Sequence, residues 1–190
     1  MGNVISAIDT TGDAFLDASI TIGADGLGLI SYRDSTNNDL KVAHCSDTNC
    51  TTATITSLDE TGNVGLDTSV TIGADGLGLI SYYDDTNDDL KVAHCSDTNC
   101  TAATITTLDS TGDVGKYTSV TIGADGLGLI SYYDATNDDL KVAHCSDTNC
   151  TAATITPLDE TGNVGLDTSV TIGADGLGLI SYYDATNDDL

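Results

Sequence analysis

The sequence contains few basic residues, a single proline and no long apolar run. Only 5 Lys and Arg residues stand against 30 Asp and Glu residues, which gives a formal net charge of −25. The field of such a chain repels phosphate backbones and anionic lipid surfaces, so we expect no nucleic acid among its partners. No stretch approaches the roughly 20 apolar residues of a membrane helix, so we expect no membrane insertion.

Helical periodicity is also missing, and a repeat takes its place. The chain matches itself when it is shifted by about 50 residues, and short apolar stretches with period-2 alternation lie between turn residues, which is the pattern of β-strands. The segment TSVTIGADGLGLISYYD and its relatives begin at Ala18, Thr68, Thr118 and Thr168, and KVAHCSDTNC begins at Lys41, Lys91 and Lys141.

The repeat predicts one domain over residues 1–190, built from four units. We place the units at approximately 1–50, 51–100, 101–150 and 151–190, of which the last lacks a copy of KVAHCSDTNC. An Asp-Gly turn is expected to join the first two strands of each unit, and a residue 4–8 strand is expected to join the last unit beside Leu177–Tyr183. In the second unit, the four predicted strands are Ser69–Gly73, Leu77–Tyr83, Leu90–Cys95 and Ala103–Leu108.

Four antiparallel strands in a repeated unit of about 50 residues resemble the blade of a β-propeller. The resemblance spans the chain and implies an all-β fold of about four four-stranded blades, similar in general plan to the propellers of secreted lectins and sialidases. The segment GADGLGLISYYD lacks the Trp that normally ends the sialidase Asp-box, and the sequence contains no Trp-Asp dipeptide. The competing architecture is an open β-solenoid or sheet array.

The six cysteines form three pairs with the spacing C-x4-C, each across a predicted hairpin loop. That spacing favours local disulfides, and disulfides imply a secreted or cell-surface protein. Metal binding by a cysteine pair with its neighbouring histidine is the weaker alternative, because it supplies three ligands rather than four and adjacent strand residues point to opposite faces. The predicted bridges are Cys45–Cys50, Cys95–Cys100 and Cys145–Cys150.

The loop after the second strand of each unit is rich in acidic residues. Carboxylates with neighbouring Asn and Thr oxygens could bind calcium, although the spacing does not match an EF-hand loop. The alternative is that these residues stabilise turns and keep strand edges soluble. The candidate calcium ligands are Asp84, Asp85, Asp88, Asp89, Asp134, Asp138 and Asp139.

A Tyr-Tyr-Asp sequence precedes each acidic loop of the last three units and offers a repeated recognition site. An aromatic face packs on sugar C–H groups while a carboxylate accepts hydrogen bonds from hydroxyls. The alternative is that one tyrosine of each pair packs between blades. The candidate ligand-binding residues are Tyr82, Tyr83, Asp84, Tyr132, Tyr133, Asp134, Tyr182, Tyr183 and Asp184.

No catalytic constellation stands out from the sequence, because the acids recur in every unit and no G-x-S-x-G motif occurs. Departures from the repeat, such as Lys116-Tyr117 in place of Leu66-Asp67, are interpreted as drift. We therefore expect an extracellular, non-enzymatic module that binds carbohydrate in a lectin-like way. The alternative is a structural subunit of an extracellular array that associates with other copies of itself through the unfilled strand slot.

Overall fold

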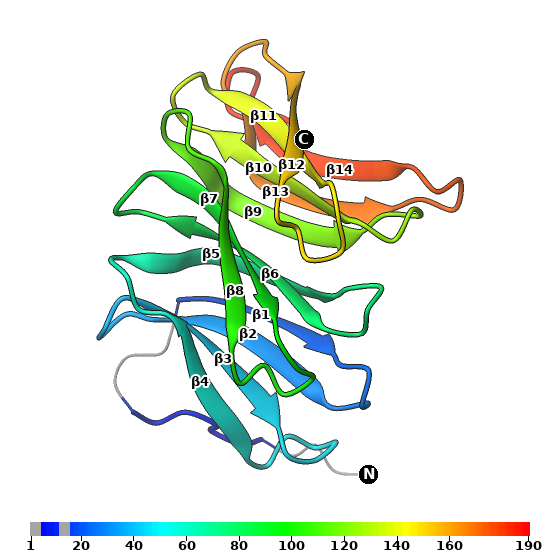
Figure 1. Ribbon diagram of the computed structural model, residues 1–190. Helices are drawn as coiled ribbons and strands as arrows, with labels where there is room; N and C mark the ends of the chain where they lie inside the picture. The colour runs from blue at the N-terminus through cyan, green and yellow to red at the C-terminus, as the bar shows by residue number, and fades with distance from the viewer. Residues whose placement is uncertain (1–4, 12–15) are drawn as a thin grey trace.

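The computed structural model describes residues 5–11 and 16–190, and every regular element among them is a β-strand. The strands form four antiparallel sheets that follow one another along the chain in an arc (Figure 1). This confirms the predicted all-β propeller fold of four-stranded blades. The sheets contain β1 (Leu16–Ile22), β2 (Gly28–Asp34), β3 (Asp39–Cys45) and β4 (Ala53–Asp59); β5 (Val64–Ile72), β6 (Gly78–Asp84), β7 (Asp89–Cys95) and β8 (Ala103–Asp109); β9 (Val114–Ile122), β10 (Gly128–Asp134), β11 (Asp139–Cys145) and β12 (Ala153–Asp159); and β13 (Val164–Ile172) with β14 (Gly178–Asp184).

The predicted Asp-Gly hairpin joins the first two strands of each blade. In the second blade, Gly73 N–H donates to the Leu77 carbonyl at 2.8 Å and Gly76 N–H donates to the Gly73 carbonyl at 3.0 Å. Gly76 has a φ of 82°, a conformation that favours glycine. The turn chemistry of this segment therefore fixes the register of the hairpin.

The first strand of each complete later blade is longer than the sequence pattern predicted. It begins at Val64 rather than Ser69, because Val64 N–H donates to the Asn38 carbonyl of the preceding blade. A β-bulge between Leu66 and Ser69 interrupts the pairing and hides the period-2 alternation on which the prediction rested. The additional residues at the start of the strand include Asp67, which lines the candidate site.

Neighbouring blades pack through their first two strands. β1 lies against β5, β5 against β9, and β9 against β13, so the first strands line the inner side of the arc. At each of the three interfaces a leucine of one blade covers a glycine of the next blade, where a side chain would clash. The pairs are Leu29 over Gly78, Leu79 over Gly128 and Leu129 over Gly178.

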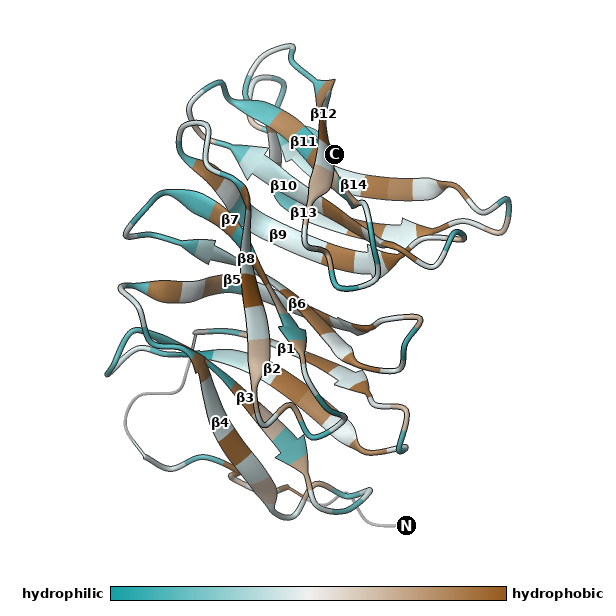
Figure 2. Ribbon diagram, viewed as in Figure 1, coloured by the Kyte–Doolittle hydropathy of each residue, from teal (hydrophilic) through white to brown (hydrophobic). Residues whose placement is uncertain are grey.

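Apolar residues lie on the strands, and polar residues occupy many of the turns (Figure 2). One cluster spans the first two blades and includes Leu29, Val70 and Ile80, and the next spans the second and third blades in the same manner. The sheet of the second blade is therefore covered on both faces, and its second strand, β6, is buried along its whole length.

The N-terminal segment does not form the strand predicted over residues 4–8. Val4 lies outside the described residues, and residues 5–10 contain no strand. Asp9 instead occupies the place that Asp59 holds one unit later, because Tyr32 Oη donates to Asp9 at 2.8 Å as Tyr82 Oη donates to Asp59 at 2.7 Å. The last sheet, β13 and β14, is therefore not joined by this segment.

The three predicted disulfides are confirmed as Cys45–Cys50, Cys95–Cys100 and Cys145–Cys150. Each links the end of a blade's third strand to the loop that leads into its fourth strand. A bridge that closes so short a ring stabilises the fold by about 2 kcal/mol through loss of entropy in the unfolded chain. Its effect is to hold the outer hairpin of the blade in register.

The leucine-over-glycine contact predicts a difference between two equivalent glycines. A Cβ built on Gly78 lies 2.7 Å from Cδ2 of Leu29 and 2.8 Å from Sγ of Cys95. A Cβ built on Gly28 lies 2.9 Å from Sγ of Cys45 and meets no leucine. We expect Gly78→Ala to lower the free energy of unfolding by about 1–3 kcal/mol, and Gly28→Ala to lower it less. Denaturant titration measures both, and equal losses would contradict the role of the leucine.

Candidate functional site

The candidate site is built from one repeated position on the inner side of the arc. The first strand of each blade contains a bulge, and the bulge residue has a positive φ of 57° at Asp17, 51° at Asp67, 54° at Tyr117 and 50° at Asp167. A bulge re-aims the side chain that it carries. Because the first strands of successive blades pack side by side, four bulge residues from four blades meet in one place.

These residues line an open hollow, which we call the axial site. Its volume is ≈ 310 Å³, and its lining residues come from the first strands of all four blades. Threonine hydroxyls fix its walls, since Thr68 Oγ1 donates to Ser31 Oγ of the preceding blade at 3.0 Å. The lining residues are Asp17, Asp67, Thr68, Tyr117, Thr118, Asp167 and Thr168.

Three carboxylates of the axial site lie in unlike environments. Asp67 is half-buried in the middle of the arc, whereas Asp17 and Asp167 are exposed. Burial raises the pKa of the Asp67 carboxyl above its usual value, and the negative charges of Asp17 and Asp167 raise it further. The Tyr117 N–H, which donates to Asp67 Oδ2 at 2.8 Å, opposes this shift. The net effect is that the pKa of Asp67 lies above its usual value.

Tyr117 breaks the fourfold repetition of the axial site. It replaces an aspartate, is one of the residues that line the hollow, and has its ring centroid 6.1 Å from that of Tyr133. The sequence interpretation treated this substitution as drift and missed the site. The signal that marks it is the one aromatic residue at a position that is aspartate in the other three units.

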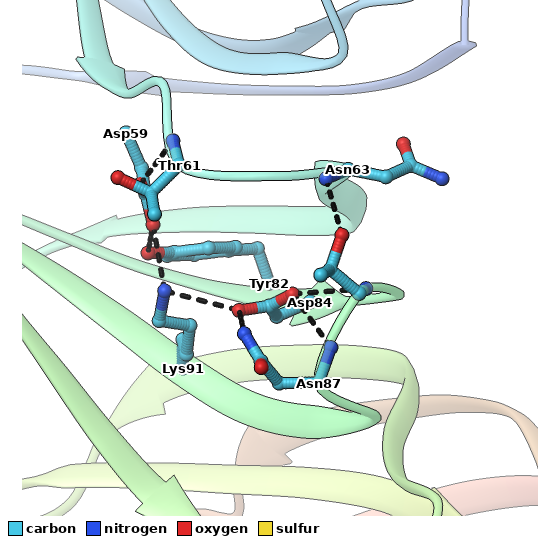
Figure 3. Close-up of polar contacts among 8 residues, drawn as sticks. Asp59, Thr61, Asn63, Tyr82, Asp84, Asn87 and Lys91 are labelled. Atoms are coloured by element: carbon cyan, nitrogen blue, oxygen red, sulfur yellow. Dashed lines mark hydrogen bonds and ion pairs between the residues drawn. The ribbon is translucent and has the colours of Figure 1, made fainter.

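The predicted tyrosine and aspartate ligands of the second blade lie in a buried polar network (Figure 3). Tyr82 and Asp84 are 0% exposed. Tyr82 Oη donates to Asp59 of the preceding blade at 2.7 Å, and Lys91 Nζ lies 2.9 Å from Asp59 Oδ2 and 3.1 Å from Asp84 Oδ2. Asn87 Nδ2 donates to Asp84 at 2.9 Å. The network joins two blades and leaves no free surface for a ligand.

The third blade repeats this arrangement with Tyr132, Asp134 and Lys141. Tyr132 Oη donates to Asp109 at 2.8 Å, and Lys141 Nζ lies 2.5 Å from Asp134 Oδ2. The second tyrosine of each pair is also occupied, since Tyr83 Oη donates to Asp88 at 2.9 Å and to Asp113 at 2.8 Å. Tyr133 makes the corresponding contacts with Asp138 and Asn163.

In the last blade, the same three residues are more accessible. Tyr183 is 36% exposed and donates to Asp188, and the half-buried Tyr182 donates to Asp159 at 2.8 Å. Asp184 accepts hydrogen bonds from Asn187 and Thr186 in its own loop. A ligand-binding role of these three residues stays a prediction.

The acidic loops use their carboxylates within the protein. Asp88 and Asp138 accept from tyrosines, Asp85 accepts from Asn63 at 2.7 Å, and burial raises the pKa of both Asp89 and Asp139. In the described part of the chain, no group of three or more His, Cys, Asp or Glu side chains is arranged to hold a metal ion. The calcium hypothesis therefore receives no support from this geometry.

Comparison with solved structures places the fold among β-propeller glycosidases. An exo-β-1,3-galactanase from Phanerochaete chrysosporium has a TM-score of 0.63 at 12% identity over 95% of this chain and 46% of its own. An α-L-arabinanase from Penicillium chrysogenum has a TM-score of 0.61 at 13% identity over 90% of this chain and 59% of its own. A family 43 α-L-arabinofuranosidase from Clostridium thermocellum has a TM-score of 0.57 at 13% identity over 90% of this chain and 61% of its own.

Because these sequence identities are low, the similarity to the solved structures concerns the fold alone. The chain spans 36%, 61% and 22% of the length of three of the similar enzymes, so it is shorter than they are. No protein-family model and no curated protein matches the sequence. The finer likeness to lectins and sialidases stays a prediction.

The expectation of a non-enzymatic protein is corrected by these comparisons. Several of the similar propellers are glycoside hydrolases, so glycosidases share this arrangement of blades. The lectin-like module and the structural subunit that assembles through a strand slot are both set aside.

The disulfides fit an oxidising environment outside the cell. None of the described residues belongs to a helix long and apolar enough to cross a membrane.

The buried network predicts a large effect of removing its cation. Burial alone would raise the pKa of Asp59, but hydrogen bonds from Lys91 and Tyr82 outweigh it and hold the pKa below the usual value. The stability that Asp59 contributes is therefore present above its unfolded pKa of about 3.9 and is lost as the pH falls through its folded pKa.

We expect Lys91→Met to lower the free energy of unfolding at neutral pH by about 3–5 kcal/mol, because two buried carboxylates lose their cation. In the variant, acidification should recover part of this loss by protonating Asp59, whose hydrogen bond from Lys91 is then missing. The control is Lys116→Met, which removes a partly exposed ion pair with Asp113 and should cost about 0–1 kcal/mol. Denaturant titrations at neutral and mildly acidic pH measure both effects. Equal losses in the two variants would contradict this account.

Proposed function

We propose that the protein is a glycoside hydrolase and that the axial site is its active site. The observation that carries the proposal is the half-buried Asp67 carboxyl, whose pKa is raised by burial and by two exposed carboxylates beside it. Glycoside hydrolysis requires two carboxyl groups in unlike environments, one that donates a proton and one that remains a carboxylate. The axial site provides this difference.

In this mechanism, Asp67 is the general acid. Its proton passes to the oxygen of the scissile glycosidic bond, so that the leaving sugar departs as an alcohol. Asp17 and Asp167 lie on the same hollow and are well solvated, which suits the carboxylate that activates the attacking water. The Tyr117 N–H holds the Asp67 carboxyl in place through its hydrogen bond.

Tyr117 also supports a carbohydrate as the substrate. An aromatic ring packs on the apolar C–H face of a sugar, and Tyr117 is among the residues that line the hollow. Two of the similar enzymes were solved with β-1,3-galactotriose and with arabinobiose, which makes galacto- and arabino-oligosaccharides the first substrates to test. We place this activity outside the cell because of the three disulfides.

The test is hydrolysis of a panel of β-1,3-linked galacto-oligosaccharides, arabino-oligosaccharides and aryl glycosides. We expect Asp67→Asn to lower kcat by about 100-fold or more, because the amide cannot donate a proton as an acid does. The activity of the unaltered protein should fall as the pH rises through the pKa of Asp67, which lies above its usual value.

The matched control is Asp97→Asn. Asp97 lies in the loop beside the Cys95–Cys100 disulfide and is not among the residues that line the axial site, so its substitution should leave kcat unchanged. Circular dichroism verifies that both variants are folded. The proposal is wrong if the unaltered protein cleaves none of these glycosides, or if Asp67→Asn cleaves them at the original rate.

A further inference from the structure

The loop between the third and fourth strands carries the same tripeptide in three blades. An asparagine that is followed by any residue except proline and then by serine or threonine is the acceptor sequence for asparagine-linked glycosylation. No other asparagine of the chain stands in such a tripeptide. The three acceptor tripeptides are Asn49-Cys50-Thr51, Asn99-Cys100-Thr101 and Asn149-Cys150-Thr151.

The asparagines of these tripeptides are exposed, and the nitrogen that would receive a sugar is unoccupied. In each case the backbone N–H donates to the aspartate two residues earlier, at 2.8 Å for Asn49, 2.9 Å for Asn99 and 3.0 Å for Asn149. Within the described residues, none of the three side-chain nitrogens donates a hydrogen bond. The loop is therefore fixed by the backbone of the asparagine, and its side-chain amide is left for other chemistry.

The asparagines of the acidic loops differ in this respect. Asn87 Nδ2 donates to Asp84 at 2.9 Å, and Asn137 Nδ2 donates to Asp134 at 2.8 Å. These side-chain nitrogens are used to stabilise their own turns. The acceptor sequence and the unoccupied amide nitrogen are two separate observations, and they coincide at the same three asparagines.

We propose that Asn49, Asn99 and Asn149 are acceptors of asparagine-linked glycans, attached before the neighbouring disulfides close. The reaction joins the side-chain nitrogen to the anomeric carbon of a sugar and breaks the bond between that carbon and the diphosphate of a lipid-linked donor. The diphosphate leaves with the electron pair, and the nitrogen loses a proton to a base of the transferring enzyme. The proposal rests on secretion of the chain and is independent of the proposed hydrolase activity.

The folded loop is a poor acceptor, which places the reaction before the loop closes. The threonine hydroxyl is part of the acceptor sequence, yet in the folded loop Thr101 Oγ1 donates to Asp97. Cys100 has a φ of 53°, and its N–H donates to the Asp97 carbonyl at 3.0 Å, so the tripeptide is bent into a turn. The Cys95–Cys100 bridge holds this turn closed. Because disulfides take on the order of seconds or longer to form, the open loop persists while the enzyme acts.

A glycan at this position would lie beside the outer edge of the blade and not at the axial site. Asn99 lies between β7 and β8, whereas the residues that line the axial site belong to first strands. Among the described strands, β8 pairs with β7 alone, and its stretch ATITTL carries no charge. An uncharged edge strand invites pairing with other chains, and a bulky polar group beside it opposes that pairing.

The test is expression of the full chain behind a removable secretory leader in a eukaryotic cell. Its mass is measured before and after enzymatic release of asparagine-linked glycans, both in the medium and in chain retained by the cell. We expect a mass above the 19.4 kDa of the unmodified chain that falls on release, with conversion of the three asparagines to aspartate. A mass that release leaves unchanged overturns the proposal.

Substitutions in the second blade assign a glycan to its site. Asn99→Gln and Thr101→Ala should each remove one glycan, and Thr101→Ser should keep it, because serine also supplies the hydroxyl. The matched control is Asn87→Gln, which alters an exposed asparagine outside any acceptor tripeptide and should leave the number of glycans unchanged. A full set of glycans on Thr101→Ala, or a glycan lost from the control, would contradict the assignment.

The order of the two reactions is tested on unmodified chain made in a host that lacks the transferring enzyme. The chain is incubated with that enzyme and its lipid-linked donor, either folded with its bridges closed or after reduction and unfolding. We expect transfer to the reduced chain at a much higher initial rate. In Cys95→Ser, which leaves the tripeptide at Asn99 unaltered, Asn99 should accept faster than Asn49 of the same molecules. Equal rates in both comparisons would show that bridge closure does not limit the reaction and would overturn the proposed order.

Discussion

The packing of a leucine on a glycine of the next blade is the contact on which the rest of the structure depends. Leu29, Leu79 and Leu129 each fill the space that a missing side chain leaves at Gly78, Gly128 and Gly178. Close approach of the blades follows, and it brings the first strands side by side on the inner side of the arc. The buried network of Tyr82, Asp59 and Lys91 then ties the same two blades together farther out.

The proposed function follows from the same geometry. Bulges at one repeated position would place a row of aspartates along a symmetric arc, and in the third blade Tyr117 replaces the aspartate. Because Asp67 lies between neighbours and is half-buried while Asp17 and Asp167 are exposed, one repeated residue type acquires unlike environments. Aspartates at the same position of the repeat therefore differ in their surroundings because of their place along the arc. A less repetitive protein would obtain such a difference by using different residue types.

Much of the fold could be predicted from the sequence, since the period of about 50 residues, the Asp-Gly turns and the C-x4-C spacing each report local structure. The candidate site could not be predicted from the sequence, because it depends on contacts between units. The bulge at Asp67 disguises the start of the first strand. Tyr82 is buried where it contacts Asp59 of the preceding blade. Period-2 alternation within one strand does not indicate which residues of two neighbouring sheets come into contact, so this burial could not be predicted.

The most direct test of this account is the carboxyl pKa of Asp67, measured by carbon-detected NMR titration. The convergence of the first strands predicts a pKa above the usual value of about 3.9. It further predicts that replacing both Asp17 and Asp167 by Asn lowers this pKa part of the way, because their charges are removed while burial remains. A pKa of Asp67 in the usual range, unaltered by the two substitutions, would contradict the account.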